Sequence, residues 1–126
     1  GGFFYIAEAH PFAWAFDDDT ATELRLNHHY WPSPDPLVFP NEGSYADPDA
    51  PVEAPFEYAW QHSMGEIVSS LAAAGLRIEY LHEHPWVPWR MFPFMVETEP
   101  GSGVWRLPEP DDARLPLLFS LKATKP

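Results

Sequence analysis

The sequence predicts an α/β domain in which one helix and several strands alternate with long loops. Residues 3–8, "FFYIAE", and residues 117–121 are apolar runs of strand length. Between them, residues 63–74 carry apolar side chains at helical spacing, and residues 76–82 alternate apolar and polar side chains. The expected order is strand, flap, helix, strand and strand, within a single domain of 126 residues.

The chain opens with a strand. After Gly1 and Gly2, the run at 3–8 is short and aromatic, which is typical of a strand buried in a sheet. Pro11 ends the pattern, because proline has no N–H to donate to a neighbouring strand. The chain starts directly in this strand and carries little helix to cover a sheet. We therefore expect it to be the rear portion of a larger catalytic domain.

Residues 17–60 are predicted to form a flap inserted into the domain and rich in aromatic residues and proline. Regular periodicity fails here, and a loop of this length in a compact domain is usually functional or disordered. Disordered chains contain few aromatic residues, whereas rings recur throughout this segment. We therefore expect an ordered flap whose rings pack on the domain.

A helix and a strand follow the flap. Ser63 and Glu66 form a capping-box pattern, in which the hydroxyl accepts the N–H of Glu66 and the carboxylate reaches back. Gly75 supplies a left-handed stop. The alternation after it predicts a half-buried strand at 76–82, and the side chains expected on one face are Leu76, Ile78 and Tyr80.

The last third of the chain is mostly loop. Residues 85–114 contain clustered prolines and tryptophans, with a short hairpin predicted around 101–103. Residues 117–121 are continuously apolar, which predicts a central strand covered on both faces.

The composition restricts the possible partners. The net charge is −12 and there is no basic stripe, so we expect neither nucleic acid nor an anionic membrane as a partner. The same charge favours a neutral or cationic small molecule. The absence of cysteine excludes disulfides and thiolate metal sites. No signal peptide and no apolar run of about 20 residues are present, so we expect a cytoplasmic protein.

Three stretches of the chain resemble a known family. They are "GGFFYIAEAHP" (1–11), "HSMGEIVSSLAAAGLRIEYLHEHP" (62–85) and "RLPLLFSLKATKP" (114–126). Together they are similar to the C-terminal part of bacterial class I S-adenosylmethionine-dependent methyltransferases. The resemblance covers most of the chain and is weakest over residues 17–56.

The resemblance implies the C-terminal half of a Rossmann-like methyltransferase sheet, which is a mixed sheet. Residues 3–8 would be the fifth of seven strands and residues 76–82 the sixth. Residues 116–123 would be an antiparallel seventh strand that lies between the other two. The implied function is the substrate-side part of an enzyme that methylates a small molecule.

The cofactor-binding half of such an enzyme has no counterpart in this sequence. In the family, a glycine-rich loop after the first strand and an acidic residue after the second hold the cofactor, and both precede the fifth strand. Here "GSG" at 101–103 lies in a loop and no strand–GxGxG–helix unit occurs. We expect S-adenosylmethionine only in the intact protein, no cofactor-binding residue here, and no activity of this segment alone.

Candidate catalytic residues follow the first strand. Ligands of open α/β sheets bind beyond the carboxyl ends of the strands, so Glu8 and His10 are best placed to meet a methyl acceptor. His10 would take the acceptor's proton, since histidine titrates near neutral pH. Alternatively, His10 only caps the loop after the strand.

The flap and the start of the helix supply candidate substrate-binding residues. Aromatic rings of the flap would roof an acceptor pocket and exclude water from it, or would simply pack on the sheet. The candidates are Tyr30, Trp31, Tyr45 and Trp60, with His62 beside the helix cap.

A metal site is the weaker possibility. His82 and His84 share one face of a strand, which permits two ligands to a metal, but no HExxH or related motif accompanies them. A histidine-rich strand end before Pro85 is the alternative. The acidic run at 17–19 is interpreted as a solvated turn. We expect no metal, although a metal-dependent β-rich protein that uses the two histidines remains a third hypothesis.

Two further expectations concern interactions. The alternative to an enzyme is a non-enzymatic module that binds a small ligand or another protein through the aromatic flap. In the similar family, a fourth strand flanks the fifth. Without it one edge of residues 3–8 is bare, and a hydrophobic bare edge recruits another strand. We therefore expect a homodimer formed through this strand.

Overall fold

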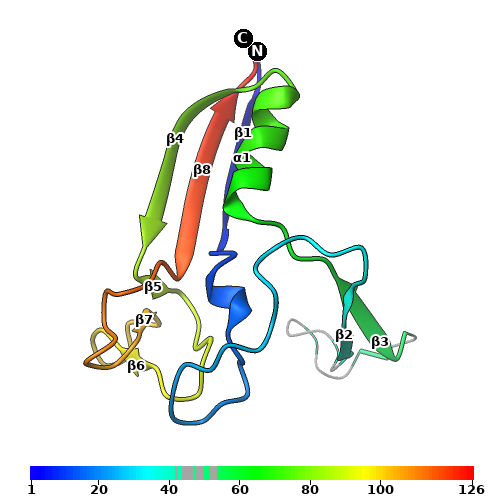
Figure 1. Cartoon of the computed structure of the whole chain (residues 1–126). Helices are drawn as coiled ribbons and strands as arrows, with labels where there is room; N and C mark the ends of the chain where they lie inside the picture. Colours follow the sequence, from blue (N-terminus) through cyan, green and yellow to red (C-terminus); the bar gives the residue numbers. More distant parts are fainter. Residues whose placement is uncertain (42, 44–46, 48–49, 52–53) are drawn as a thin grey trace.

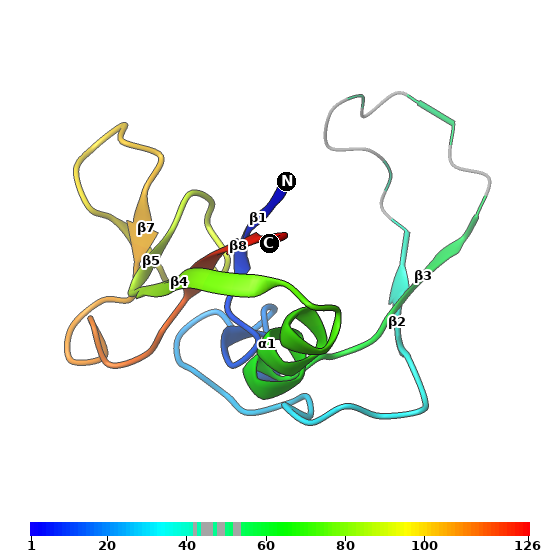
Figure 2. The same cartoon turned by 90° about the horizontal axis from the view of Figure 1, so that it is seen from above.

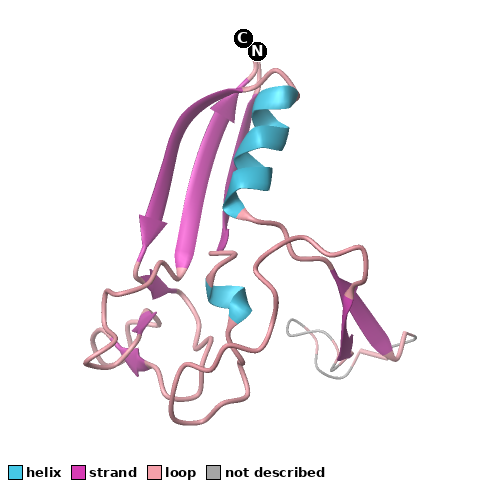
Figure 3. Ribbon diagram, viewed as in Figure 1, coloured by secondary structure: helices cyan, strands magenta, loops and turns pink. Residues whose placement is uncertain are grey.

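The computed structural model describes residues 1–41, 43, 47, 50–51 and 54–126. It shows an α/β fold with mostly antiparallel strands and one longer helix (Figure 3). In chain order the elements are β1 (Phe3–Ala9), the short 3-10 helix η1 (Ala13–Ala15), β2 (Leu37–Pro40), β3 (Phe56–Ala59), α1 (Met64–Ala73), β4 (Arg77–His84), β5 (Trp86–Val87), β6 (Val96–Glu97), β7 (Trp105–Arg106) and β8 (Leu118–Thr124).

The main sheet has the order β1-β8-β4 (Figure 1). The last strand pairs antiparallel with both neighbours, which confirms that the opening and closing strands are adjacent. The expected mixed sheet is wrong for the described residues, because every neighbouring pair in the three sheets is antiparallel. β1 and β4 run in the same direction but are separated by β8. The structure thus shows an α/β fold, and its strand pairing alone does not show half of a Rossmann-like sheet.

Helix α1 begins and ends as its sequence predicts. The hydroxyl of Ser63 accepts the N–H of Glu66 at 3.1 Å, and Gly75 adopts a φ of 79° after the last turn. The second half of the capping box is wrong, because the Glu66 carboxylate accepts a hydrogen bond from Nδ1 of His62 at 2.8 Å instead. The side chain of His62 is therefore fixed beside the first turn of the helix.

A hydrophobic core fills the space between α1 and the sheet. Figure 2 shows the helix lying along one face of the three strands. Phe119, Leu121 and Ala123 of β8 are fully buried there and pack against the apolar stripe of the helix, which confirms β8 as the central strand. A second core lies under the loops at the other end of the sheet, around Phe92 and Leu107.

The two chain ends meet at the end of the sheet that is remote from these loops (Figure 1). The N–H of Lys125 donates to the carbonyl of Gly2 at 3.0 Å, which extends the β1–β8 pairing. At the opposite end, β1 and β4 both reach their carboxyl ends beside the start of β8.

A β-bulge interrupts the regular alternation of β4 between Ile78 and Tyr80. The prediction that these two side chains share a face is therefore wrong. Ile78 faces the helix, whereas Tyr80 lies on the other face and stacks on His82 with ring centroids 4.5 Å apart. Hydrogen bonds from Thr124 and then Arg77 hold the pKa of Glu79, the bulge residue, below its ordinary value.

β1 differs from the buried strand that its apolar sequence predicts. It forms one edge of the sheet, and Phe3 and Tyr5 are 71% and 52% exposed, whereas Ala9 is its one buried residue. The difference arises because burial of an edge strand depends on a further strand and on layers over both faces, and one helix covers only one face.

The flap and the last loop region both contain short hairpins. Within the flap, β2 and β3 pair antiparallel, although the sequence shows no strand periodicity there. The predicted hairpin around 101–103 is confirmed by the pairing of β6 with β7, and β5 adds a third strand. Among the described residues, no helix combines the length and the apolar character needed to cross a membrane.

Candidate functional site

An open cleft of about 1140 Å³ lies at the carboxyl end of β1. Its walls come from β1 and the loop after it, from the β2–β3 hairpin, from the start of α1 and from Trp89 in the loop after β5. Figure 1 shows the hairpin standing to one side of the sheet, below the first turn of the helix. Segments far apart in the sequence therefore build one site.

Aromatic rings form much of the cleft. The three tryptophans of the lining remain well exposed, at 41% for Trp14, 52% for Trp60 and 38% for Trp89. Their exposed surface is therefore open to a ligand rather than consumed by packing. The rings in the lining are those of Trp14, Phe16, Phe39, Trp60, Trp89 and the buried Phe119, with the imidazoles of His28 and His62.

The ionisable groups of the cleft are three carboxylates and two histidines, His28 and His62, of which His62 is hydrogen-bonded to Glu66. Glu8, Asp18 and Glu57 line it and are exposed, and its lining includes neither lysine nor arginine. Within the described part of the chain, none of the three side chains forms an ion pair or a hydrogen bond. Their negative charges therefore act on whatever enters the cleft.

Glu8 is the predicted catalytic residue that the structure places in the cleft. It lies opposite Phe119 on one side of β8, and Glu83 of β4 lies opposite the same residue on the other side. The two carboxylates thus stand on one face of the sheet, with backbones roughly 10 Å apart. Glu83 has a partner, whereas Glu8 is free to bind a cation or accept a proton.

The partner of Glu83 is His10, the second predicted catalytic residue. His10 is 4% exposed and lies just below the cleft wall formed by Ala9 and Pro11. Its Nδ1 accepts the N–H of Phe12 at 3.1 Å, so the proton of the neutral ring is on Nε2. Nε2 donates to Oε1 of Glu83 at 2.8 Å.

These contacts constrain the proposed role of His10 as a base. Both ring nitrogens are engaged, so neither has a lone pair that points to an acceptor molecule. The backbone of His10 also donates to Leu117 and accepts from Ala13. The arrangement favours a positioning role, in which His10 fixes the loop that carries Trp14 into the cleft. Proton transfer by His10 stays a prediction.

The predicted flap residues divide into two groups. Trp60 and His62 line the cleft. Tyr30 does not, because its hydroxyl accepts the N–H of Met64 at 3.1 Å and so satisfies a free donor of the first helical turn. Trp31 is 69% exposed and packs on Tyr30, outside the cleft. Tyr45 lies outside the described residues.

Sequence reasoning missed most of the lining residues, and for two of them the sequence held a usable signal. Trp14 follows β1, and Trp89 follows β4 and the short β5. Because β1 and β4 end at the same end of the main sheet, the rule that ligands bind beyond strand ends points to both residues. Asp18 and Glu57 had no such signal, because their position depends on the path of the flap.

The histidines of β4 face away from the helix. The rings of His82 and His84 are 6.4 Å apart, and Nε2 of His84 lies 3.5 Å from the hydroxyl of Ser120. In the described part of the chain, no third potential ligand joins them.

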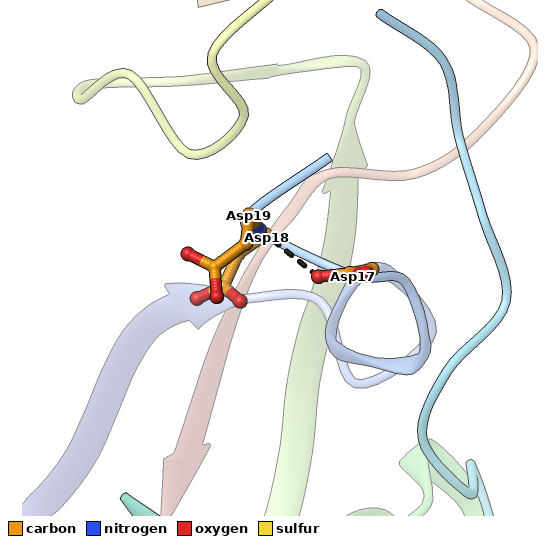
Figure 4. A group of neighbouring side chains, drawn as sticks. All are labelled: Asp17, Asp18 and Asp19. Carbon is orange, nitrogen blue, oxygen red and sulfur yellow. Dashed lines mark hydrogen bonds between the residues drawn. The ribbon is translucent and has the colours of Figure 1, made fainter. Parts of the chain in front are cut away.

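The acidic run that follows η1 forms the compact group in Figure 4. Ligand oxygens of Asp17, Asp18 and Asp19 lie within 4.8 Å of one another. The N–H of Asp19 donates to Oδ1 of Asp17 at 3.0 Å, which is the hydrogen bond of an Asx turn. Because exposed acidic turns form without a metal, we assign no cation site to this group.

Comparisons with protein-family models, with curated proteins and with solved structures returned no match to this chain.

Proposed function

We propose that these residues are the substrate-side part of an S-adenosylmethionine-dependent methyltransferase that acts on a small molecule. The observation that carries the proposal is the cleft at the carboxyl end of β1, which contains Glu8 and exposed tryptophans. Ligands of open α/β sheets bind at this end of the strands. The proposal places cofactor binding in the preceding half of the intact protein, so the 126 residues alone would be inactive.

The strand arrangement supports the same proposal. The sequence resemblance implies two parallel strands with the last strand antiparallel between them. The order β1-β8-β4 with antiparallel pairing on both sides of β8 is consistent with that arrangement. The helix between β3 and β4 packs on one face, in agreement with the implied helix before the sixth strand.

The cleft residues would act mainly by positioning the acceptor. Bound S-adenosylmethionine would supply an electrophilic methyl group. Holding the acceptor nucleophile in line with it makes the reaction effectively unimolecular. The rings of Trp14 and Trp60 would hold the acceptor and exclude water, and Glu8 would accept a proton released by the acceptor.

Calorimetry with S-adenosylmethionine tests this function. We expect the 126-residue chain to bind no cofactor, and the full gene product that contains it to bind the cofactor and transfer its labelled methyl group to a small molecule. Tight cofactor binding by the 126 residues would contradict the division into two halves. A full gene product without cofactor binding would refute the methyltransferase. A cytoplasmic location is part of the same proposal and is tested by cell fractionation.

The exposed edge of β1 favours association of the chain with a second copy of itself. In the described residues β1 pairs only with β8, and Phe3, Phe4 and Tyr5 are exposed beside the free edge. Such an edge recruits a further strand. We therefore propose that the isolated chain forms a homodimer through β1.

Light scattering tests the dimer. We expect the mass of two chains at high concentration, and Tyr5→Glu should restore a monomer, because a charge on an exposed edge opposes strand pairing. The new carboxylate would lie opposite Lys122, so the sheet itself should tolerate it. The matched control is Tyr58→Glu, which alters a tyrosine that is 59% exposed on β3 and should leave the dimer intact. A wild-type monomer at every concentration would rule out the dimer.

A further inference from the structure

We infer that the cleft selects a cationic amine with an apolar body, and that this is the substrate class of the proposed methyltransferase. That the ligand is a substrate depends on the proposed function, whereas the class of ligand is inferred from the composition of the cleft. Two independent features of the lining point to the same kind of ligand.

The first feature is the sign of the charge. Glu8, Asp18 and Glu57 bring three unpaired carboxylates to the cleft, and no lysine or arginine of the lining offsets them. A cleft lined by charges of one sign concentrates the field and attracts ligands of the opposite sign. An anionic acceptor, such as a carboxylate or a phosphate ester, would be repelled by the same groups.

The second feature is the exposed aromatic surface. Trp14, Trp60 and Trp89 present indole surface in the cleft. Tryptophan is the side chain that binds a cation most strongly through its ring face, and groups of rings recognise alkylated ammonium ions in this way. The chain already contains such a contact elsewhere, since the guanidinium of Arg90 lies 5.3 Å from the ring centroid of Trp105.

The two features suit different parts of one molecule. The rings of Phe16 and Phe39, which are half-buried, offer apolar surface to the body of the ligand. The carboxylate of Glu8 stands where β1 ends and is free to hold an ammonium group. On methyl transfer, the amine would lose a proton to Glu8. Its lone pair would then form the new N–C bond while the S–C bond breaks, with the bonding electrons remaining on sulfur.

Three probes of similar shape and different charge test the inference on the 126-residue chain. They are phenyltrimethylammonium, its uncharged isostere tert-butylbenzene, and benzoate. Binding is followed through the indole N–H signals of the tryptophans in NMR titrations at physiological ionic strength. We expect the cation to bind about tenfold more tightly than the uncharged isostere, and benzoate not to bind.

Matched variants locate the binding site. Glu8→Gln should weaken binding of the cation several-fold and leave the uncharged isostere unchanged, whereas Trp60→Leu should weaken both. The controls are Glu99→Gln and Trp31→Leu, which alter an exposed carboxylate and an exposed indole outside the cleft. Both controls should bind like the wild type.

The outcomes separate the inference from the proposed function. Equal binding of the cation and the uncharged isostere, or equal losses in Glu8→Gln and Glu99→Gln, would overturn the cationic substrate class and leave the cleft as an acceptor site. If no probe binds, both the inference and the placement of the acceptor in this cleft are wrong. Cofactor binding by the full gene product tests the methyltransferase independently of either result.

Discussion

Replacing Phe119 by alanine is expected to lower the free energy of unfolding by about 3–5 kcal/mol. Phe119 is fully buried in the central strand, where it packs against the apolar face of α1 and lies edge-on to the ring of His10. Removing the ring deletes apolar burial and leaves a cavity between layers that are fixed by the β-sheet pairing. A loss of this size is a large part of the 5–15 kcal/mol by which native domains are stable.

Urea denaturation followed by circular dichroism measures the effect. The matched control is Phe3→Ala, because Phe3 lies in the neighbouring strand but is 71% exposed. Phe3→Ala should lower the free energy of unfolding by less than about 1 kcal/mol, and this figure includes the lost contact between Phe3 and Lys122. Equal losses in the two variants would show that α1 does not pack on the central strand in solution.

Replacing His10 by alanine is expected to destabilise the chain by about 2–4 kcal/mol. The variant loses the hydrogen bond to the Glu83 carboxylate and leaves the N–H of Phe12 without its acceptor. It also leaves a gap beside Phe119. Because His10 joins β4 to the loop after β1, we expect the loss of order to include the part of the cleft wall around Trp14.

Two further substitutions separate the hydrogen bonds of His10. In His10→Asn, the amide oxygen can take the place of Nδ1 and accept from Phe12, so only the bond to Glu83 is lost. In His10→Gln, the longer amide can donate to Glu83, so only the bond to Phe12 is lost. Each variant should keep about half of the stability that alanine removes, as judged from chemical denaturation.

The same pair of variants distinguishes positioning from proton transfer. If His10 only positions the loop, His10→Asn and His10→Gln in the full gene product should keep methyl transfer with an unchanged pH profile. Loss of activity in both variants, with their stability retained and the rising limb of the pH profile removed, would instead establish His10 as the base.

Local sequence signals predicted the helix and the central strand well. The cap at Ser63, the stop at Gly75 and the apolar stripe between them act within one helix, so they need no knowledge of the rest of the chain. The bulge after Ile78 was not predictable in this way, because it is set by the register between β4 and β8. The exposure of β1 was missed for a related reason, since burial depends on neighbours that the periodicity of a strand does not reveal.

The candidate site was predictable where it follows the strand ends. Glu8 comes from the strand-end rule, and Trp60 and His62 lie beside the predicted helix cap. Composition alone could not show which flap rings turn toward the cleft. Tyr30 uses its hydroxyl to satisfy a helix N–H, and that choice depends on how the long segment before α1 folds back.

The hydrogen bond between Gly2 and Lys125 makes the distance between the two termini a measure of whether the main sheet is folded. The two termini stay together only while β1 and β8 remain paired. They lie at the end of the sheet that is remote from the cleft. A donor and an acceptor dye attached at the two termini would therefore report separation of β1 from β8 as a fall in energy transfer. The dyes would not contact the surface where a small molecule is proposed to bind.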